Sequence, residues 1–191
     1  KFSTPEEDAS RRDFTINAMF WDIKTQALHD FVGGERDLKA RIIRTVGVAK
    51  DRFDEDKLRM IRAIRFVAEL GFDLDPEIVA DITRRPKDIK VVSAERIWEE
   101  LKKVTAGQYF VRGLELLRDT GLLEFILPGV RLRDSGLQKL KALKSPSVLS
   151  VLSLIFIEGS DSLVIVEDDL RLLKVSNETR TQVRGMVQAL R

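Results

Sequence analysis

The residues from Lys57 to Leu70 read KLRMIRAIRFVAEL, and this stretch decides the fold. Its apolar side chains, from Leu58 to Ala68, recur at the three- and four-residue spacing of an α-helix that buries one face. Gly71 follows at the position where helices commonly end in a left-handed residue. The sequence therefore predicts a strong helix over residues 57–70.

The chain that follows repeats the helical pattern. Pro76 suits the first turn of a second helix, and Ser93 is a typical N-cap for a third. Further helices are predicted at residues 110–118, 136–144, 147–157, 162–173 and 177–190, with glycines between them. There are no repeats and no low-complexity linker, so this part is expected to be an all-helical array.

The chain before the long helix has a different pattern. Residues 14–23 are rich in Phe, Ile, Thr and Trp, and a second apolar stretch follows at 27–32, which predicts a β-hairpin. A short helix is expected at 35–41 and an extended segment at 42–46. This is the only part predicted to contain strands. It is too small to bury a proper sheet, so we expect further strands to precede it.

Composition excludes several classes of site. The 191 residues include no cysteine, which excludes a disulfide framework, a thiolate zinc site and a cysteine nucleophile, and fits a cytoplasmic location. The single histidine, His29, argues against a His-rich metal site or a Ser-His-Asp triad. With a net charge of +2, any nucleic-acid contact must come from local patches. The longest apolar run, residues 148–157, is too short to span a bilayer, so no membrane partner is expected.

The segment RRDFTINA, residues 11–18, is the first that could carry chemistry. Arg11 and Arg12 offer forked donors that suit phosphate or ribose oxygens. Asp13 can accept from a ribose hydroxyl, and Asn17 can donate and accept. The alternative is a charged entrance to a strand with a local ion pair.

The second such segment opens the long helix. Asp56 and Arg59 are three residues apart, and on one helical face they would present an acceptor beside a donor fork. That combination matches the edge of cytosine or adenine, whose exocyclic amine would donate to Asp56. Arg62 and Arg65 continue the spacing toward a triphosphate or an RNA backbone. An ordinary ion pair and a solvated face are the alternatives.

Gly33 and Gly34 form the third segment. Paired glycines before a helix can let the backbone approach a phosphate or supply a hinge. The segment lacks the Lys-Ser/Thr of a P-loop and the spacing of a dinucleotide-binding loop. A tight turn is the alternative.

Four segments in order resemble the motifs of the class II CCA-adding enzymes and bacterial poly(A) polymerases. RRDFTINA (11–18) is similar to the motif RRDxTxNA, and EDKLRMIRAIRF (55–66) to EDxxRxxRAxRF. DFVGGERDL (30–38), followed by RIIR (41–44), resembles the connection between head and neck. SAERIWEEL (93–101) resembles the last motif, in the neck helices. The match covers roughly the first 105 residues, and the later helices resemble the body domain only weakly.

The resemblance implies a mostly α fold, in which a small α/β remnant of a nucleotidyltransferase head precedes an all-helical neck and body. Residues 1–45 would be the C-terminal part of the head domain. Residues 46–105 would be the helical, nucleotide-selecting neck, and residues 106–191 the helical, RNA-binding body.

The resemblance also implies an activity. It is the template-independent transfer of CMP and AMP from CTP and ATP to the 3′ end of tRNA, to which this chain would contribute base selection and RNA binding. Poly(A) synthesis is an alternative within the family. A non-catalytic RNA-binding module and a purely structural helical scaffold are alternatives outside it. The oligomeric state is left open.

The resemblance assigns roles residue by residue. Arg12, Asp13 and Asn17 would contact ribose and phosphates, while Asp56 and Arg59 would read the incoming base. Arg62 and Arg65 complete the predicted nucleotide-binding set. The Gly33-Gly34 connection would serve as a hinge, and the glutamate and arginine at positions 95 and 96 would mainly steady the neck.

The resemblance places Mg²⁺ ligands outside this chain. In the family, a Gly-Ser phosphate loop and paired metal-binding aspartates precede the RRD motif, and no such pair precedes Arg11. Two-metal transfer needs fixed carboxylates. We therefore expect no catalytic residue and no metal ligand here, Mg²⁺ ligands in a missing N-terminal segment, and no activity from the chain alone.

Overall fold

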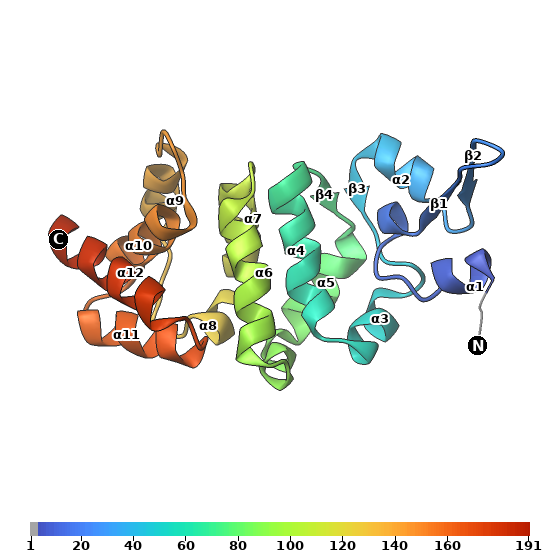
Figure 1. Cartoon of the computed structure of the whole chain (residues 1–191). Coiled ribbons are helices and arrows are strands. Elements are labelled where there is room, and N and C mark those ends of the chain that lie inside the picture. The colour runs from blue at the N-terminus through green and yellow to red at the C-terminus, as the bar shows by residue number, and fades with distance from the viewer. Residues whose placement is uncertain (1–3) are drawn as a thin grey trace.

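The computed structural model describes residues 4–191 and shows one row of elements that follows the chain. In Figure 1 the small N-terminal elements lie at the right and the last helices at the left. Residues 1–3 of the predicted head region 1–45 lie outside the described residues. The expected fold class, mostly α with a small α/β part at the start, is confirmed.

The N-terminal part is built on a short hairpin. It comprises α1 (Pro5–Ala9), the 3-10 turn η1 (Thr15–Asn17), β1 (Met19–Asp22), β2 (Ala27–Asp30) and α2 (Gly34–Ala40). β1 and β2 pair antiparallel, so the predicted hairpin is confirmed, but the strand predicted from residue 14 begins only at Met19. The reason is that the Thr15 amide donates to the Arg44 carbonyl at 2.9 Å, and its hydroxyl donates to Asp37 at 2.8 Å. These bonds hold residues 15–17 in a turn.

A second strand pair joins this part to the helices. β3 (Ile42–Ile43) runs parallel to β4 (Asp73–Leu74), which follows the long helix. The prediction that strands occur only before the long helix is therefore wrong. β4 was not predicted because a strand of two residues shows no alternation in the sequence. Phe14 also forms an antiparallel bridge with Thr45.

The central helices pack around α4 (Leu58–Leu70), the helix predicted first. Gly71 ends it with a φ of 68°, as expected. The other elements are α3 (Ala49–Glu55), α5 (Pro76–Arg84), the 3-10 helix η2 (Pro86–Val91), α6 (Ala94–Ala106) and α7 (Phe110–Asp119). A Cβ on Gly107, in the α6–α7 turn, would lie 2.4 Å from the Ala68 carbonyl oxygen, so this turn touches the backbone of α4.

The last part of the chain is helical throughout. It comprises α8 (Leu123–Ile126), α9 (Asp134–Lys141), α10 (Val148–Gly159), α11 (Leu163–Leu172) and α12 (Asn177–Leu190). All the helices predicted here form, with shifted ends; α8 and α3 were not predicted. One continuous apolar core extends from Phe14 to Val187, so the α/β part and the helices are packed together. Among residues 4–191, no helix has the length and apolar character needed to cross a membrane.

A buried carboxyl group joins α11 to the turn before α9. Asp169 is buried, and its carboxylate accepts from the Gly129 amide at 3.0 and 3.2 Å. Burial raises the pKa of Asp169 from 3.8 to about 6, against the opposing effect of the Gly129 amide. Because the folded-state pKa is the higher one, the folded chain binds more protons between these values. This contribution to stability is present below pH 3.8 and is lost as the pH rises through 6.

Asp169→Asn should therefore stabilise the chain at pH 8, by about 1–2 kcal/mol, and give no gain near pH 4. The amide oxygen still accepts from Gly129, while no charge has to be buried. Thermal unfolding at the two pH values measures the difference. Asp161→Asn, at an exposed position before α11, is the control and should change stability little at either pH. A variant that is less stable than wild type at pH 8 would contradict the argument.

Candidate functional site

An open polar pocket lies where the α/β part meets α4 and α6. Its volume is about 530 Å³. Six of the seven predicted site residues line it, and only Arg65 lies elsewhere. The lining residues are Arg12, Asp13, Asn17, Asp56, Leu58, Arg59, Arg62 and Arg96. Four guanidinium groups face two carboxylates, so the pocket favours an anionic ligand.

Asp13 anchors one wall of the pocket. Its Oδ2 accepts from the Nε of Arg62 at 2.9 Å, and its Oδ1 accepts from the Phe14 amide at 2.9 Å. Its carbonyl accepts from the Val46 amide at 3.2 Å. The side-chain contact joins residues that are far apart in the sequence, so the α/β part and α4 form the site together. Nearby, Arg12 pairs with Asp8 at 2.7 Å.

Asp56 lies in a bend between α3 and α4, at φ −151° and ψ 107°. The prediction that it shares a helical face with Arg59 is therefore wrong, although both line the pocket. The bend forms because α3 ends at Glu55 and Oδ1 of Asp56 accepts from the Leu58 amide at 3.0 Å, at the start of the next helix. Oδ2 accepts from Arg96 at 2.7 Å.

The surroundings of Asp56 keep it ionised. Partial burial acts to raise its pKa, but the hydrogen bonds from Arg96 and the Leu58 amide outweigh burial, and the pKa lies below its usual value. Arg59 pairs with Glu55 at 2.6 Å and donates to the Arg52 carbonyl at 3.0 Å, so it does not form the ion pair with Asp56 that the spacing allowed. The two side chains present an acceptor and a donor fork to the same space.

Arg65 lies outside the pocket. Its guanidinium pairs with Glu100 at 2.9 Å and Glu69 at 3.2 Å, and its centre lies 3.9 Å from the Phe66 ring centroid. Only 12 % of the side chain is exposed. Arg65 is therefore neither on a solvated face nor turned toward the pocket, and it joins α4 to α6.

Arg96 is a charged pocket residue that the predicted nucleotide-binding set does not include. The resemblance gave it a supporting role in the neck, yet it lines the pocket and contacts Asp56. The contact spans 40 residues, so no local spacing reveals it. The available signal is its position: a cation in the first turn of a helix opposes the helix dipole and needs a partner.

The Gly33-Gly34 link is a closed turn. The Asp30 carboxylate accepts from the amides of residues 32–35, at 2.9–3.1 Å. Burial acts to raise the pKa of Asp30, but these four bonds outweigh it and lower the pKa. A Cβ on Gly34 would lie 2.3 Å from the Thr15 carbonyl oxygen. The amides are thus engaged by Asp30, which supports the tight turn over a phosphate-binding loop.

A Mg²⁺ ion does not fit the side chains of this pocket. Among residues 4–191, no group of three or more His, Cys, Asp or Glu side chains is arranged to hold a metal ion. Asp13 and Asp56, the two carboxylates that line the pocket, are each paired with an arginine. Mg²⁺ prefers several oxygen ligands that have no competing cation.

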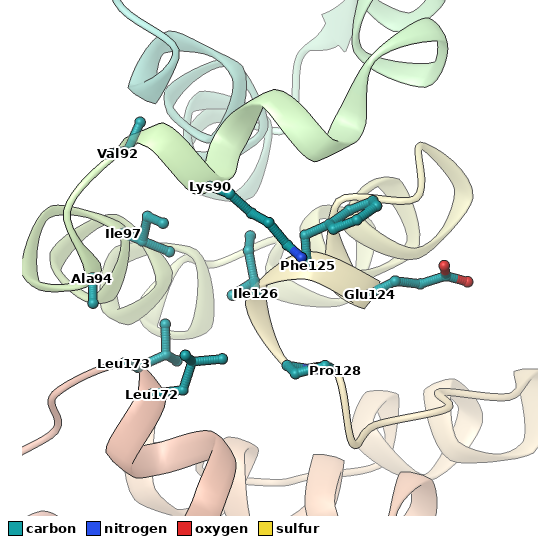
Figure 2. Close-up of a pocket in the computed structure, with 10 residues that line it drawn as sticks. All are labelled: Lys90, Val92, Ala94, Ile97, Glu124, Phe125, Ile126, Pro128, Leu172 and Leu173. Atoms are coloured by element: carbon teal, nitrogen blue, oxygen red, sulfur yellow. The ribbon is translucent and has the colours of Figure 1, made fainter.

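A separate apolar cavity of about 440 Å³ lies between η2, the start of α6, α8 and the end of α11. Figure 2 shows Lys90 reaching toward Phe125, and the ammonium lies 5.1 Å from the ring centroid. Glu124 is the other charged residue of the lining. The remaining lining is apolar, so this cavity offers little chemistry, and the arginine-rich pocket is the better candidate site.

The fold and the pocket define a mainly helical protein with an arginine-lined pocket where a small α/β part joins a helical array. A family model described as the poly(A) polymerase head domain matches residues 1–44. Another, described as the probable RNA and SrmB-binding site of polymerase A, matches residues 71–133. The chain belongs to the family of CCA-adding enzymes and bacterial poly(A) polymerases.

Similar proteins agree with this assignment. The chain is 43% identical over 141 residues to the CCA-adding enzyme of Geobacillus stearothermophilus, covering 74% of this chain and 34% of that protein. It is 36% identical over 129 residues to poly(A) polymerase I of Escherichia coli O157:H7, covering 68% of this chain and 28% of that one. The chain thus spans about a third of the length of these relatives.

Solved structures match nearly the whole chain. The Bacillus stearothermophilus CCA-adding enzyme in complex with CTP has a TM-score of 0.85 and 34% identity, over 99% of this chain and 48% of that one. A tRNA nucleotidyltransferase complexed with a primer tRNA and an incoming ATP analogue has a TM-score of 0.81 and 26% identity, over 100% of this chain and 60% of that one.

Proposed function

We propose that this chain is the base-selecting and RNA-holding part of an enzyme that adds CCA to the 3′ end of tRNA, without a template, from CTP and ATP. The observation that carries the proposal is the pocket, in which Asp56 and Arg59 lie beside Asp13 and Arg62. Structures of similar proteins with CTP, an ATP analogue and tRNA support the same substrates.

The pocket offers the groups that base selection requires. The exocyclic amine of cytosine or adenine would donate to the Asp56 carboxylate, and Arg59 would donate to a ring nitrogen or carbonyl. Uracil and guanine carry a carbonyl oxygen in place of that amine and would meet an acceptor. One site could thus admit two bases and refuse two.

The other arginines would hold the rest of the nucleotide. Arg12 and Arg62 line the pocket and would bind phosphate oxygens, since a guanidinium donates in a planar fork. Asp13 and Asn17 would contact the ribose. Arg65 remains in the proposed set only as a residue that supports the position of α4, because Glu100 and Glu69 hold it.

The division of the chain follows from these roles. Residues 1–45 would be the end of the head, residues 46–105 the nucleotide-selecting neck, and residues 106–191 the RNA-binding body. Bacterial tRNA processing would place the protein in the cytoplasm.

Mg²⁺, when bound, would activate the primer hydroxyl and neutralise the triphosphate. Because the two carboxylates of the pocket are paired with arginines, the Mg²⁺ ligands would be carboxylates outside this chain. The chain by itself is therefore expected to incorporate no nucleotide.

The test uses the full-length gene product with Mg²⁺ and a tRNA that lacks CCA. It is supplied with CTP alone, ATP alone, or both, and the products are separated by length. We expect two C residues from CTP alone and a complete CCA end from the mixture. Long tails from ATP alone would instead favour poly(A) polymerase, which the match to the Escherichia coli enzyme makes the second candidate. No incorporation, with salt-dependent tRNA binding, would favour a non-catalytic RNA-binding module.

A further inference from the structure

Arg96 lies at a place where a helix disfavours a cation. It is the third residue of α6, and the first turn of a helix carries a partial positive charge that favours acids. Its neighbour Glu95 suits that turn and pairs with Lys174 at 2.7 Å. Arg96 is 52 % exposed and directs its Nη2 to Asp56, at 2.7 Å. The unfavourable position is therefore offset by one specific contact in the pocket.

Asp56 depends on that contact for its direction. The residue is outside both helices, so no helical backbone fixes its side chain. Oδ1 is held by the Leu58 amide at 3.0 Å and Oδ2 by Arg96, so the two bonds together fix the plane of the carboxylate. A carboxylate oxygen has two acceptor sites. Oδ2 can therefore accept from Arg96 and from a base amine at the same time.

We propose that Arg96 is a positioning residue for base selection, which holds the Asp56 carboxylate aimed into the pocket as an acceptor. This inference rests on the proposed function. The resemblance assigned Arg96 only a role in steadying the neck. The inference adds a role in base specificity, which the motif does not reveal. The base would contact Asp56, and Arg96 would act through it.

Protonation shows why the contact matters. An ionised carboxylate only accepts, whereas a protonated one can donate to the carbonyl oxygen of uracil or guanine and so loses selectivity. The groups that act on Asp56 are Arg96 from α6, and the Leu58 amide and Arg59 from α4, and the Asp13–Arg62 pair lines the same pocket. Removing the Arg96 charge raises the pKa of Asp56, so discrimination should weaken first at acid pH.

The test uses the full-length enzyme with Arg96→Ala, Arg96→Gln and Arg96→Lys. For each variant, kcat/KM is measured with CTP, ATP, UTP and GTP across pH 5–8. For Arg96→Ala we expect the preference for CTP and ATP over UTP and GTP to fall about tenfold or more, with the larger loss at acid pH. Arg96→Lys keeps the charge and should retain part of the preference that Arg96→Ala loses. Arg96→Gln keeps a donor on a shorter side chain but not the charge.

Glu95→Ala is the matched control, because it removes an exposed ion pair from the same helical turn away from the pocket. It should leave the preference unchanged. If Arg96→Ala lowers kcat/KM equally for all four nucleotides, the preference is unchanged and Arg96 has a purely structural role. That result, or a variant with wild-type kcat/KM for all four, would overturn the proposal. Wild-type enzyme that incorporates nothing would refute the proposed function itself, a result distinct from either. Thermal unfolding of each variant confirms that the folded enzyme is being compared.

Discussion

Replacing Arg44 by methionine is expected to destabilise the folded chain by about 3 kcal/mol. Asp37, in α2, is 1 % exposed, and the Nε of Arg44 donates to it at 3.1 Å. Arg44 also pairs with Asp75, which caps α5 by accepting from the Glu77 amide at 2.8 Å. The methionine would leave the buried Asp37 carboxylate with the Thr15 hydroxyl and the exposed Arg36, whose Nε lies 3.5 Å away. Removing one partner of a buried charge costs more than the pair contributes.

Chemical denaturation measures the change. Lys39→Ala is the control, since it breaks an exposed ion pair on the same α2 helix and should cost less than about 0.5 kcal/mol. In the double variant Asp37→Asn with Arg44→Met the stranded carboxylate at position 37 is gone, while Asp75 still lacks its arginine, so the variant should recover part of the loss. A change for Arg44→Met as small as that of Lys39→Ala would show that the network contributes little.

Replacing Asp56 by alanine in the full-length enzyme should lower kcat/KM for both CTP and ATP about 10- to 100-fold. Loss of a well-aligned base contact corresponds to about 1–3 kcal/mol. Both nucleotides should be affected because, in the proposed function, both bases would donate an amine to the Asp56 carboxylate. Single-nucleotide incorporation into tRNA with either triphosphate measures the effect.

Asp51→Ala, at an exposed acidic position in α3, is the control for this change and should leave both rates near wild type. Asp56→Ala also removes the bond to the Leu58 amide, so the stability of the variant is checked by thermal unfolding, with an expected loss of about 1 kcal/mol. If CTP addition falls while ATP addition is retained, Asp56 does not read the amine that the two bases share.

The sequence predicts the helices well where one face is apolar over many residues. In α4 the buried residues recur at helical spacing from Leu58 onward, and Gly71 ends the helix as expected. α3 was missed because, apart from Ala49 and Phe53, its seven residues are not buried, and so show no periodicity. The two-residue β4 forms because its backbone pairs with β3, and the local sequence does not encode this contact.

The site was predicted as a set of residues more closely than as a geometry. The resemblance predicted the forked donors and acceptors at 12–17 and 56–62 as one binding set, whereas their chemistry alone left ordinary ion pairs open. The fold brings them into one pocket. The direction of each side chain depends on distant partners. Arg62 turns to Asp13 and Arg96 to Asp56, contacts that span 49 and 40 residues.

The bridge between Phe14 and Thr45 limits which segments can be combined in chimeras of related proteins. The Thr15 amide donates to the Arg44 carbonyl and the Val46 amide donates to the Asp13 carbonyl. Residues on both sides of the proposed boundary between residues 45 and 46 therefore share one backbone ladder. A chimera that takes residues 46–105 from one relative and the preceding segment from another crosses this ladder and also recombines the two halves of the Asp13–Arg62 pair. Parents that differ at either half would yield hybrids whose pocket is mismatched, even when every helix folds.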